Sequence, residues 1–206
     1  MWECEKYQMS CGNCPRLSSH KENDLSRKVF NRKKETFKEI KNLTLVGLSH
    51  WLADCAAKSS LFKSRPVRVL PNPIDTEIFS PIEKNIARSL LGLPIGKKLI
   101  LFGAMSSTSD INKGFQELCQ ALHKLKTENV ELVVFGASQP ETSPSFSQKA
   151  HYLGRLHDDV TLRVLYSAAD VMLVPSKQEA FGQAASESMA CGTPSVAFAT
   201  TGLLDI

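Results

Sequence analysis

Long hydrophobic runs are absent from this chain of 206 residues, and no stretch approaches the roughly 20 apolar residues of a membrane-spanning helix. The first residues, Met-Trp-Glu-Cys-Glu-Lys, also lack the charged-then-apolar order of a signal peptide. Hydrophobic residues make up 42% of the chain and charged residues 22%, which is typical of a globular protein with a substantial core. We therefore expect a cytoplasmic protein.

Metal-binding motifs are scarce. No Asp-x-Asp is present, and the histidines show neither metal-ligand spacing nor a nucleophile partner (His20, His50, His123, His151 and His157). Cys11 and Cys14 have the separation that zinc sites use, and Cys4 lies close by, but no second cysteine pair completes a set of four. Both a metal site and three reduced thiols stay open, and we favour the thiols.

Positive charge gathers in the first half of the chain. Residues 1–96 carry 16 Lys and Arg against 10 Asp and Glu, whereas residues 97–206 carry 9 against 11. The densest stretch is 27–41, where apolar side chains recur on one helical face: Phe30, Phe37 and Ile40. Such a helix either docks on anionic lipid at the inner membrane face or packs its apolar edge on the protein's own core, and we favour the core. No nucleic-acid-binding motif is present, so a nucleic acid partner is not expected.

Strand-like and helix-like segments alternate along the chain, which predicts an α/β fold with mainly parallel sheets. The expected strands are 43–49, 67–70, 98–103, 130–136, 151–156, 171–175 and 195–199. The expected helices are 50–60, 82–91, 114–125, one that begins at Asp158 or Asp159, and 183–190. The segment from Pro71 to Pro81 interrupts this pattern and is the best candidate for a linker.

Two carboxylates eight positions apart are the most informative feature. Glu179 follows a short apolar strand, and Glu187 lies in the helix expected over 183–190. Between them, the amides of Phe181 and Gly182 fall at the start of that helix, where unpaired N–H groups and a partial positive charge favour a phosphate. The pattern indicates a ligand in which a diphosphate is flanked by two hydroxyl-bearing sugars.

The segment Glu-Ala-Phe-Gly-Gln-Ala-Ala-Ser-Glu-Ser-Met-Ala-Cys-Gly-Thr-Pro resembles the Glu-x7-Glu signature of retaining glycosyltransferases of family GT4, which have the GT-B fold. Similar residues occur in the order of that family elsewhere in the chain: Asn72–Asp75, Asn112–Gly114, Tyr166–Ser176 and Thr201–Ile206. The resemblance extends from about Cys11 to the last residue. It implies Rossmann-like parallel sheets of the GT-B type, incomplete at both ends.

The same resemblance divides the chain into parts. Residues 1–75 would be the end of an N-terminal, acceptor-side domain, and residues 76–96 a linker and connecting helix. Residues 97–206 would be most of the C-terminal, donor-binding domain. The family's acceptor-side histidine and glycine-rich loop have no matching position in this sequence.

The resemblance also implies roles for particular residues. Glu187 would accept hydrogen bonds from the ribose hydroxyls of the donor, and Glu179 would meet the transferred sugar or the positive charge that develops on it. Lys113 matches the family's phosphate lysine and would stabilise the leaving diphosphate. The catalytic residues would then be Glu179 and Lys113, with donor contacts from Glu187, Phe181, Gly182, Gly103, Gly136 and Arg155. Ala104 stands where many relatives carry an arginine, and Arg155 is a candidate to compensate for it.

The expected activity is transfer of a sugar, with retention of configuration, from a UDP- or GDP-sugar to a glycan or lipid-linked acceptor. No metal and no cofactor are expected. The alternative is an inactive fragment that binds the nucleotide-sugar but lacks the acceptor domain. The donor base, the sugar and the acceptor stay open.

Overall fold

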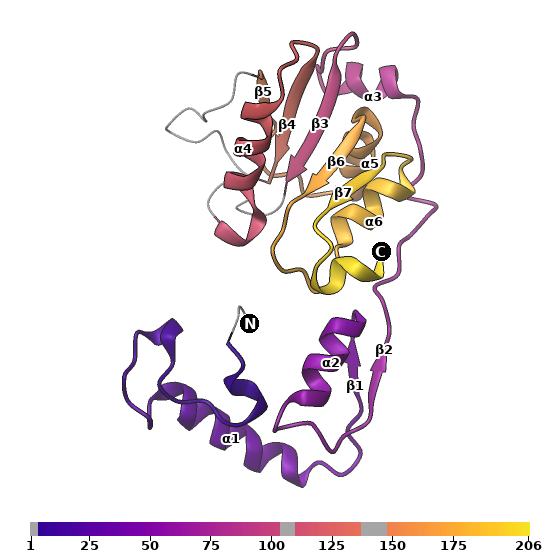
Figure 1. The fold of residues 1–206 in the computed structure, drawn as a ribbon. Coiled ribbons are helices and arrows are strands. Elements are labelled where there is room, and N and C mark those ends of the chain that lie inside the picture. Colours follow the sequence, from indigo (N-terminus) through magenta and orange to yellow (C-terminus); the bar gives the residue numbers. More distant parts are fainter. Residues whose placement is uncertain (1–3, 104–109, 137–147) are drawn as a thin grey trace. The chain divides into compact units, whose positions relative to one another are not determined.

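A computed structural model describes residues 4–103, 110–136 and 148–206. The chain forms two compact units, Met1–Pro71 and Asn72–Ile206 (Figure 1). The boundary between them falls at the start of the proline-rich segment that the sequence marks as a linker. None of the helices in the described ranges is both long and apolar enough to cross a membrane.

The first unit contains a small β-α-β arrangement. Strands β1 (Leu45–Gly47) and β2 (Val67–Val69) pair in parallel, and helix α2 (His50–Lys58) connects them and packs on both. Ser49 caps α2, because its hydroxyl accepts a hydrogen bond from the Leu52 amide at 3.2 Å. Two short 3-10 helices, Lys6–Gln8 and Pro15–Leu17, precede these elements.

The basic segment forms helix α1 (Leu25–Glu39), as predicted, with Asp24 as its N-cap. Phe30 is buried, and the ring of Phe37 lies 5.0 Å from that of Phe62, centroid to centroid. The Arg65 guanidinium also donates to the Phe37 carbonyl at 2.7 Å. Phe30 and Phe37 thus face the unit's own interior, which is the alternative that the sequence favoured over insertion into lipid. Ile40, the third residue of the expected apolar face, instead lies past the helix end as its C-cap and is exposed.

The second unit is built on a five-stranded parallel sheet in the order β5-β4-β3-β6-β7. The strands are β3 (Lys98–Gly103), β4 (Val130–Phe135), β5 (Ala150–Tyr152), β6 (Val171–Val174) and β7 (Ser195–Ala197). The helices are α3 (Lys84–Leu90), α4 (Phe115–Lys124), α5 (Asp159–Ala168) and α6 (Gln183–Ala190). Two 3-10 helices, Ile111–Lys113 and Thr201–Asp205, follow strand ends.

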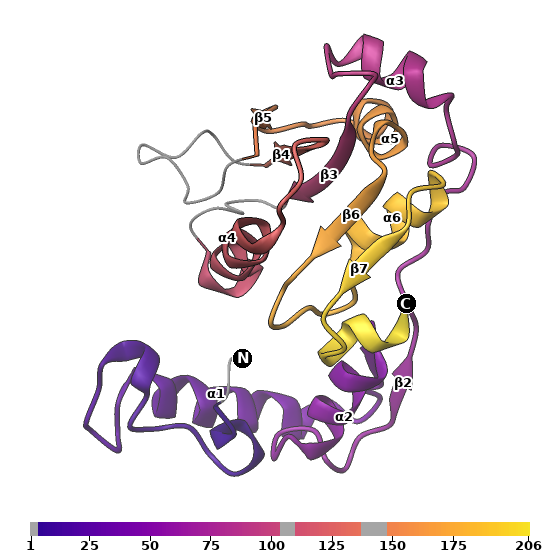
Figure 2. The same ribbon diagram turned by 45° about the horizontal axis from the view of Figure 1, so that its top comes forward.

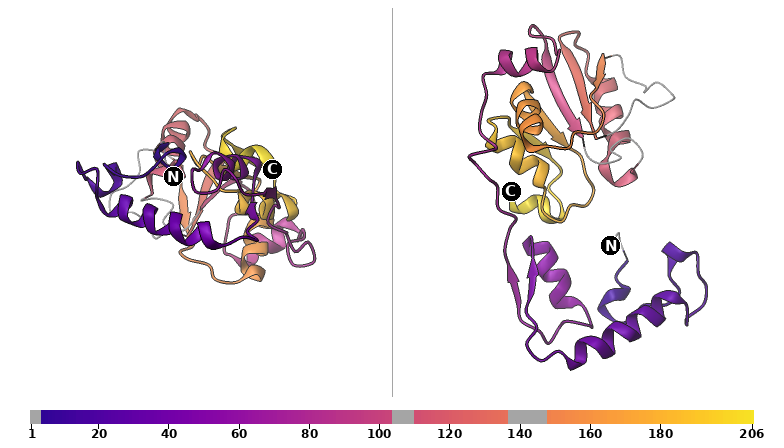
Figure 3. Two further views of the ribbon diagram at one scale, coloured as in Figure 1. Left: turned by 90° about the horizontal axis from the view of Figure 1, so that it is seen from below. Right: turned by 180° about the vertical axis from the view of Figure 1, so that it is seen from behind.

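Helices cover both faces of this sheet (Figure 2). Residues of α5 and α6 pack on one face with Val133 and Phe135, while α4 packs on the other with Leu132 and Val134. This alternation along β4 follows from the period of two in a strand and makes the strand apolar on both sides. Helices α3 and α5 contact each other on the α5 face (Figure 3).

The strands and helices expected from the sequence are all found, most of them shorter by one or more residues at their ends. The largest difference concerns the strand expected over 151–156, which is Ala150–Tyr152. Gly154 has a left-handed φ of +65°, and its carbonyl accepts a hydrogen bond from the Gly136 amide at 2.7 Å. The chain therefore turns where the apolar pattern suggested a continuing strand.

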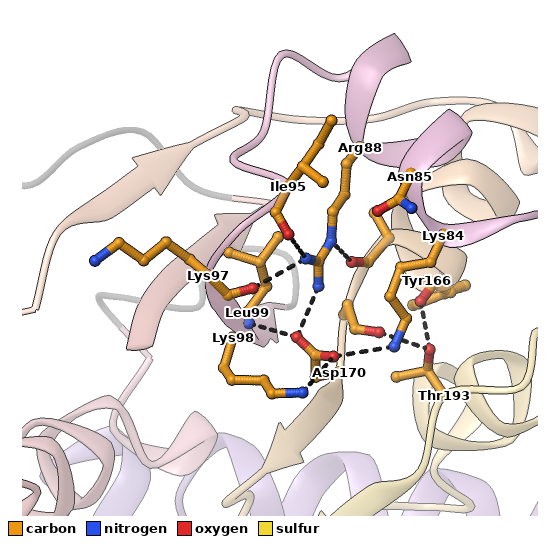
Figure 4. A network of polar contacts seen from close by, with 12 residues as sticks. Lys84, Asn85, Arg88, Ile95, Lys97, Lys98, Leu99, Tyr166, Asp170 and Thr193 are labelled. Atoms are coloured by element: carbon orange, nitrogen blue, oxygen red, sulfur yellow. Dashed lines mark hydrogen bonds and ion pairs between the residues drawn. The ribbon is translucent and has the colours of Figure 1, made fainter. Parts of the chain in front are cut away.

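An ionic cluster around the buried Arg88 joins α3 to the amino ends of β3 and β6 (Figure 4). Arg88 is 3% exposed; it donates to the carbonyls of Ile95, Lys97 and Ala168 at 2.9 Å each and to Asp170 at 2.7 Å. Asp170 also accepts from the Leu99 amide at 2.8 Å and from Lys84 at 3.0 Å. The charges of Arg88 and Asp170 are thus paired with backbone groups and side chains of the same unit.

Candidate functional site

The order of strands reverses between β3 and β6. The chain runs outward from β3 through β4 to β5, then returns to β6, on the other side of β3, and continues to β7. In open parallel sheets, ligands bind in the crevice beyond the carboxyl ends of the strands at such a reversal. The loop after β3 carries Lys113, and the loop after β6 carries Glu179.

The backbones of these two loops lie in close contact at Gly114. This glycine has a φ of +69°, and a Cβ there would lie 2.0 Å from the Pro175 carbonyl oxygen, so a side chain is excluded on both counts. The Lys177 amide donates to the Asn112 carbonyl at 2.9 Å. Glycine at this position therefore lets the backbone beside Lys113 approach the loop that leads to Glu179.

The backbone of Glu179 is held by the segment after β7. Its amide donates to the Thr201 hydroxyl at 2.9 Å, and its carbonyl accepts from the Gly202 amide at 3.0 Å. A Cβ at Gly202 would lie 2.3 Å from the Ala180 carbonyl oxygen, so the approach requires glycine. Thr201 itself has a φ of +50°, which is uncommon for a residue other than glycine.

Lys113 and Glu179 form an ion pair, with Nζ 2.5 Å from Oε1. Their side chains are 23% and 22% exposed, so the pair is accessible to a ligand. Both residues line a pocket of about 190 Å³, which Gly103, Gly182 and Gln183 also line. The pocket therefore joins a cation and a carboxylate at the carboxyl ends of β3 and β6.

The pocket reaches the amino end of α6. Gly182 is the N-cap of this helix, with a φ of +110°, and the helix covers Gln183–Ala190 as predicted. The first amides of a helix have no acceptor within the helix, and they carry a partial positive charge. The same pocket is thus lined by Lys113 and by the first residues of α6.

Glu187 is half-buried on α6, and both of its carboxylate oxygens accept hydrogen bonds. The Tyr166 hydroxyl donates to Oε2 at 2.8 Å, and the Gln183 side-chain amide donates to Oε1 at 3.0 Å. Burial raises the pKa of Tyr166 far above its usual value, and the Glu187 carboxylate adds to that effect. The phenol therefore remains a protonated donor.

Glu187 does not itself line the pocket; its link to the pocket is Gln183, which does. Phe181 is buried, and Arg155 is exposed on the surface. Gly136 ends β4 with a φ of +79° and donates its amide to the Gly154 carbonyl. Of the residues expected from the sequence, the structure thus gathers Gly103, Lys113, Glu179 and Gly182 around one pocket, with Glu187 one hydrogen bond away.

The glycine at 103 has a packing reason that the sequence did not indicate. A Cβ there would lie 2.2 Å from the Phe135 ring, which also packs edge-on against Tyr166 with centroids 6.1 Å apart. Gly103 therefore makes room for an aromatic side chain on the neighbouring strand. That ring in turn contacts the residue that holds Glu187.

The sequence analysis did not identify three residues that hydrogen-bond to the two glutamates: Tyr166, Gln183 and Thr201. Tyr166 has the helical spacing of a core residue, and its hydroxyl partner is 21 positions away in the chain. The contact of Gln183 with Glu187 could have been predicted, because Gln183 lies four positions before Glu187 on the same helix face. Thr201 is brought to Glu179 only by the fold.

Within the described residues, no group of three or more His, Cys, Asp or Glu side chains is placed to hold a metal ion. Cys4, Cys11 and Cys14 are free thiols. The position of Ala104, where many GT4 members carry an arginine, lies outside the described residues.

Known proteins have related sequences. Residues 96–206, more than half of the chain, match the family described as glycosyl transferases group 1. A D-inositol 3-phosphate glycosyltransferase of Xylanimonas cellulosilytica is 38% identical in an alignment of 153 positions, which covers 66% of this chain and 36% of that protein. An uncharacterized glycosyltransferase of Methanocaldococcus jannaschii is 33% identical in an alignment of 144 positions, with the same coverage of 66% and 36%. The chain thus spans about a third of the length of these relatives.

Solved structures share the fold. A sucrose-phosphate synthase from Thermosynechococcus elongatus matches with a TM-score of 0.66 and 26% identity, over 91% of this chain and 48% of that one. WaaG, a glycosyltransferase involved in lipopolysaccharide biosynthesis, matches with a TM-score of 0.67 and 25% identity, over 86% and 49%. HepE from Anabaena, solved with UDP-glucose, matches with a TM-score of 0.61 at 18% identity, over 84% and 50%, a likeness in fold alone.

The parallel sheets with helices on both faces and these likenesses confirm the expected α/β fold of the GT-B type. The family match covers the whole of the strand and loop series that builds the pocket, from β3 to the segment that holds Glu179. The chain belongs to the glycosyl transferases group 1 family.

Proposed function

We propose that this chain carries the donor site of a retaining glycosyltransferase of family GT4. The enzyme would move a sugar from a UDP- or GDP-sugar to a glycan or lipid-linked acceptor. In this proposal residues 97–206 form the domain that binds the donor, and residues 1–75 belong to the acceptor-side domain. Residues 76–96 connect these two domains. The names of the relatives support glycosyl transfer as the reaction class.

The observation that carries the proposal is the Lys113–Glu179 pair in a pocket at the amino end of α6. A nucleotide-sugar has a diphosphate between two sugars, and so requires cationic and N–H groups flanked by hydrogen-bond acceptors. Lys113 and the first amides of α6 suit the diphosphate. Glu179 suits the hydroxyls of the transferred sugar, and Glu187 those of the ribose.

Donor binding would rearrange the ion pair. Lys113 and Glu179 neutralise each other in the described state, because their charged atoms are 2.5 Å apart. A diphosphate in the pocket competes with Glu179 for the ammonium group and leaves the carboxylate free for the sugar. As the bond from sugar to phosphate breaks, negative charge grows on the leaving phosphate, and the fixed Lys113 cation stabilises that charge.

The setting we propose for the enzyme is the cytoplasm, with contact at the inner membrane face where the acceptor is lipid-linked. The exposed cationic side of α1 supports attraction to an anionic surface. Because Phe30 and Phe37 face inward, this contact is proposed as electrostatic and not as insertion.

The test is a calorimetric titration of the folded chain with UDP, GDP and ADP, repeated with Glu187→Ala. We expect saturable binding of one diphosphate and at least about a 10-fold loss of affinity in the variant, since its ribose contacts are charge-assisted hydrogen bonds. A folded chain that binds none of the three contradicts the proposal. Unchanged affinity in a folded Glu187→Ala chain contradicts the ribose role alone.

Adding the nucleotide-sugar of the base that binds to the same folded chain, with and without candidate acceptors, distinguishes transfer from binding. The sugar released from a bound donor by water or by an acceptor is followed by NMR, which reads the configuration at its anomeric carbon. Release with retention supports the enzyme. Saturable binding of the donor, with no release of its sugar in the presence of any acceptor tested, would favour the inactive fragment.

A further inference from the structure

The side chain of Tyr166 is placed to fix the orientation of the Glu187 carboxylate. Tyr166 is 1% exposed, and its hydroxyl donates to Glu187 Oε2 at 2.8 Å. The hydroxyl reaches from α5 to α6, two helices on the same face of the sheet. A hydroxyl group that is buried in the core and donates to a half-buried carboxylate can fix the orientation of that carboxylate.

Tyr166 is itself held rigidly. Its carbonyl accepts a hydrogen bond from the buried Thr193 hydroxyl at 2.7 Å (Figure 4). Its ring contacts Phe79 and Phe135, with centroids 6.3 and 6.1 Å away. Backbone and ring are therefore both constrained, and the hydroxyl has a defined position.

The second carboxylate oxygen has its own donor. Gln183 Nε2 lies 3.0 Å from Glu187 Oε1, so the two donors come from different helices and engage different oxygens. Two donors on two oxygens fix the rotation of the carboxylate plane. Each oxygen has two acceptor positions, so one position remains on each for a ligand.

We propose that Tyr166 is a positioning residue, which orients the Glu187 carboxylate so that its two remaining acceptor positions bind the cis-diol of a ribose. The inference rests on the proposed function, in which Glu187 meets the ribose of the donor. A vicinal diol offers two O–H donors on one edge, and a carboxylate held in one plane matches both at once. Without the Tyr166 hydroxyl, the carboxylate can rotate and loses this match.

The experiment pairs a change in the protein with a change in the ligand. UDP and GDP are titrated into wild-type chain, Tyr166→Phe and Tyr152→Phe, and so are their 2′,3′-dideoxy forms, which lack the diol. Tyr152→Phe is the matched control, because the Tyr152 hydroxyl is buried and has no hydrogen-bond partner in the described part of the chain. Circular dichroism establishes that each variant is folded.

The wild-type chain is expected to prefer the ribose form by about 10-fold or more, as two charge-assisted hydrogen bonds require. Tyr166→Phe should lose most of that preference while its affinity for the dideoxy form stays unchanged. Tyr152→Phe should keep the preference. A purely structural role of Tyr166 would instead weaken both forms equally, so equal weakening overturns the inference.

A second variant covers the case in which Tyr166→Phe does not fold. Gln183→Leu removes the other donor and should lose part of the preference. Full preference in a folded Tyr166→Phe chain overturns the inference and leaves the proposed function standing; where Tyr166→Phe does not fold, full preference in a folded Gln183→Leu chain does the same. A wild-type chain that binds both nucleotide forms equally removes the ribose role of Glu187, and a folded chain that binds neither overturns the proposed function as well.

Discussion

The two edges of the sheet in the second unit both carry ion pairs, but the pairs differ in their surroundings. At the amino edge, Arg88 is buried and bonded to three carbonyls and to Asp170. At the carboxyl edge, Lys113 is partly exposed in a pocket, with Glu179 as its one ion-pair partner among the described residues. Charge committed to backbone acceptors stabilises the fold, whereas charge with one replaceable partner remains available to a ligand.

The chemistry of the two cations fits this division. An arginine presents five N–H donors in a planar fork, which suits several fixed acceptors at once. A lysine is a compact charge on a flexible stem, and it can turn from one anion to another. The comparison therefore predicts that changes at the amino edge act on stability, and that changes at the carboxyl edge act on binding.

Replacing Arg88 should have the largest effect on the free energy of unfolding. Arg88→Met removes the buried cation and leaves the carbonyls of Ile95, Lys97 and Ala168 without this donor. The expected loss is about 3 to 5 kcal/mol, measured by urea denaturation with circular dichroism. Lys84→Met is the control; Lys84 pairs with Asp170 but is 44% exposed, so its loss should stay within about 1 kcal/mol. Similar values for the two variants would contradict the account of the cluster.

Gly103→Ala should come next. The new Cβ would overlap the Phe135 ring, and the buried ring must shift against Tyr166. The expected loss of stability is about 1 to 3 kcal/mol, as for other overpacked sites. Gly96→Ala is the control, because a Cβ there meets nothing within 4 Å and its φ is unstrained. If both variants unfold at the wild-type urea concentration, the packing reason for Gly103 is wrong.

The stability provided by Asp170 should depend on pH. Burial opposes its ionisation, but the Leu99 amide and the Lys84 and Arg88 cations outweigh burial and hold the pKa of this carboxyl below its ordinary value. The ionised form is thus favoured in the folded chain, so its stabilisation is complete above the ordinary pKa of about 3.9 and is lost as the pH falls through the lowered value. The difference in unfolding free energy between wild type and Asp170→Asn should be constant near neutral pH and shrink below about pH 4. A difference that does not change down to pH 2 would contradict this reading.

The smallest effect on stability is expected at the carboxyl edge. Lys113→Met removes a partly exposed ion pair, and such pairs contribute at most about 1 kcal/mol. The same urea titration measures it beside Arg88→Met. A loss as large as that of Arg88→Met would show that the pair is structural and would remove the contrast between the two edges.

Much of this fold follows from the sequence. The helix Gln183–Ala190 was predicted at its observed bounds, because Gly192 takes the left-handed conformation (φ +81°) just after its end and Pro194 follows. The strands were recognised because they are apolar on both sides, as buried parallel strands are. The strand near 151–156 was predicted too long, since no local pattern marks the hydrogen bond from Gly136 to Gly154.

The site was predictable only where its signal was local. Glu179, Gly182 and Lys113 stand in short motifs after strands, and the structure places them around one pocket. Tyr166 and Thr201 reach their partners across 21 and 22 positions, so only the packing of distant elements brings them to the two glutamates. The packing of Gly103 against Phe135 was hidden for the same reason.

The most direct test of the central claim is the affinity of the wild-type chain and of Lys113→Met for UDP and for uridine, measured by calorimetry, with GDP and guanosine in parallel. Lys177→Met is the matched control, since Lys177 lies on the loop that carries Glu179, pairs with Glu117 of α4 and is 44% exposed. The account predicts that Lys113→Met loses about 10- to 100-fold in affinity for the diphosphate and almost nothing for the nucleoside, while Lys177→Met resembles wild type. Undiminished diphosphate binding by a folded Lys113→Met chain would contradict it.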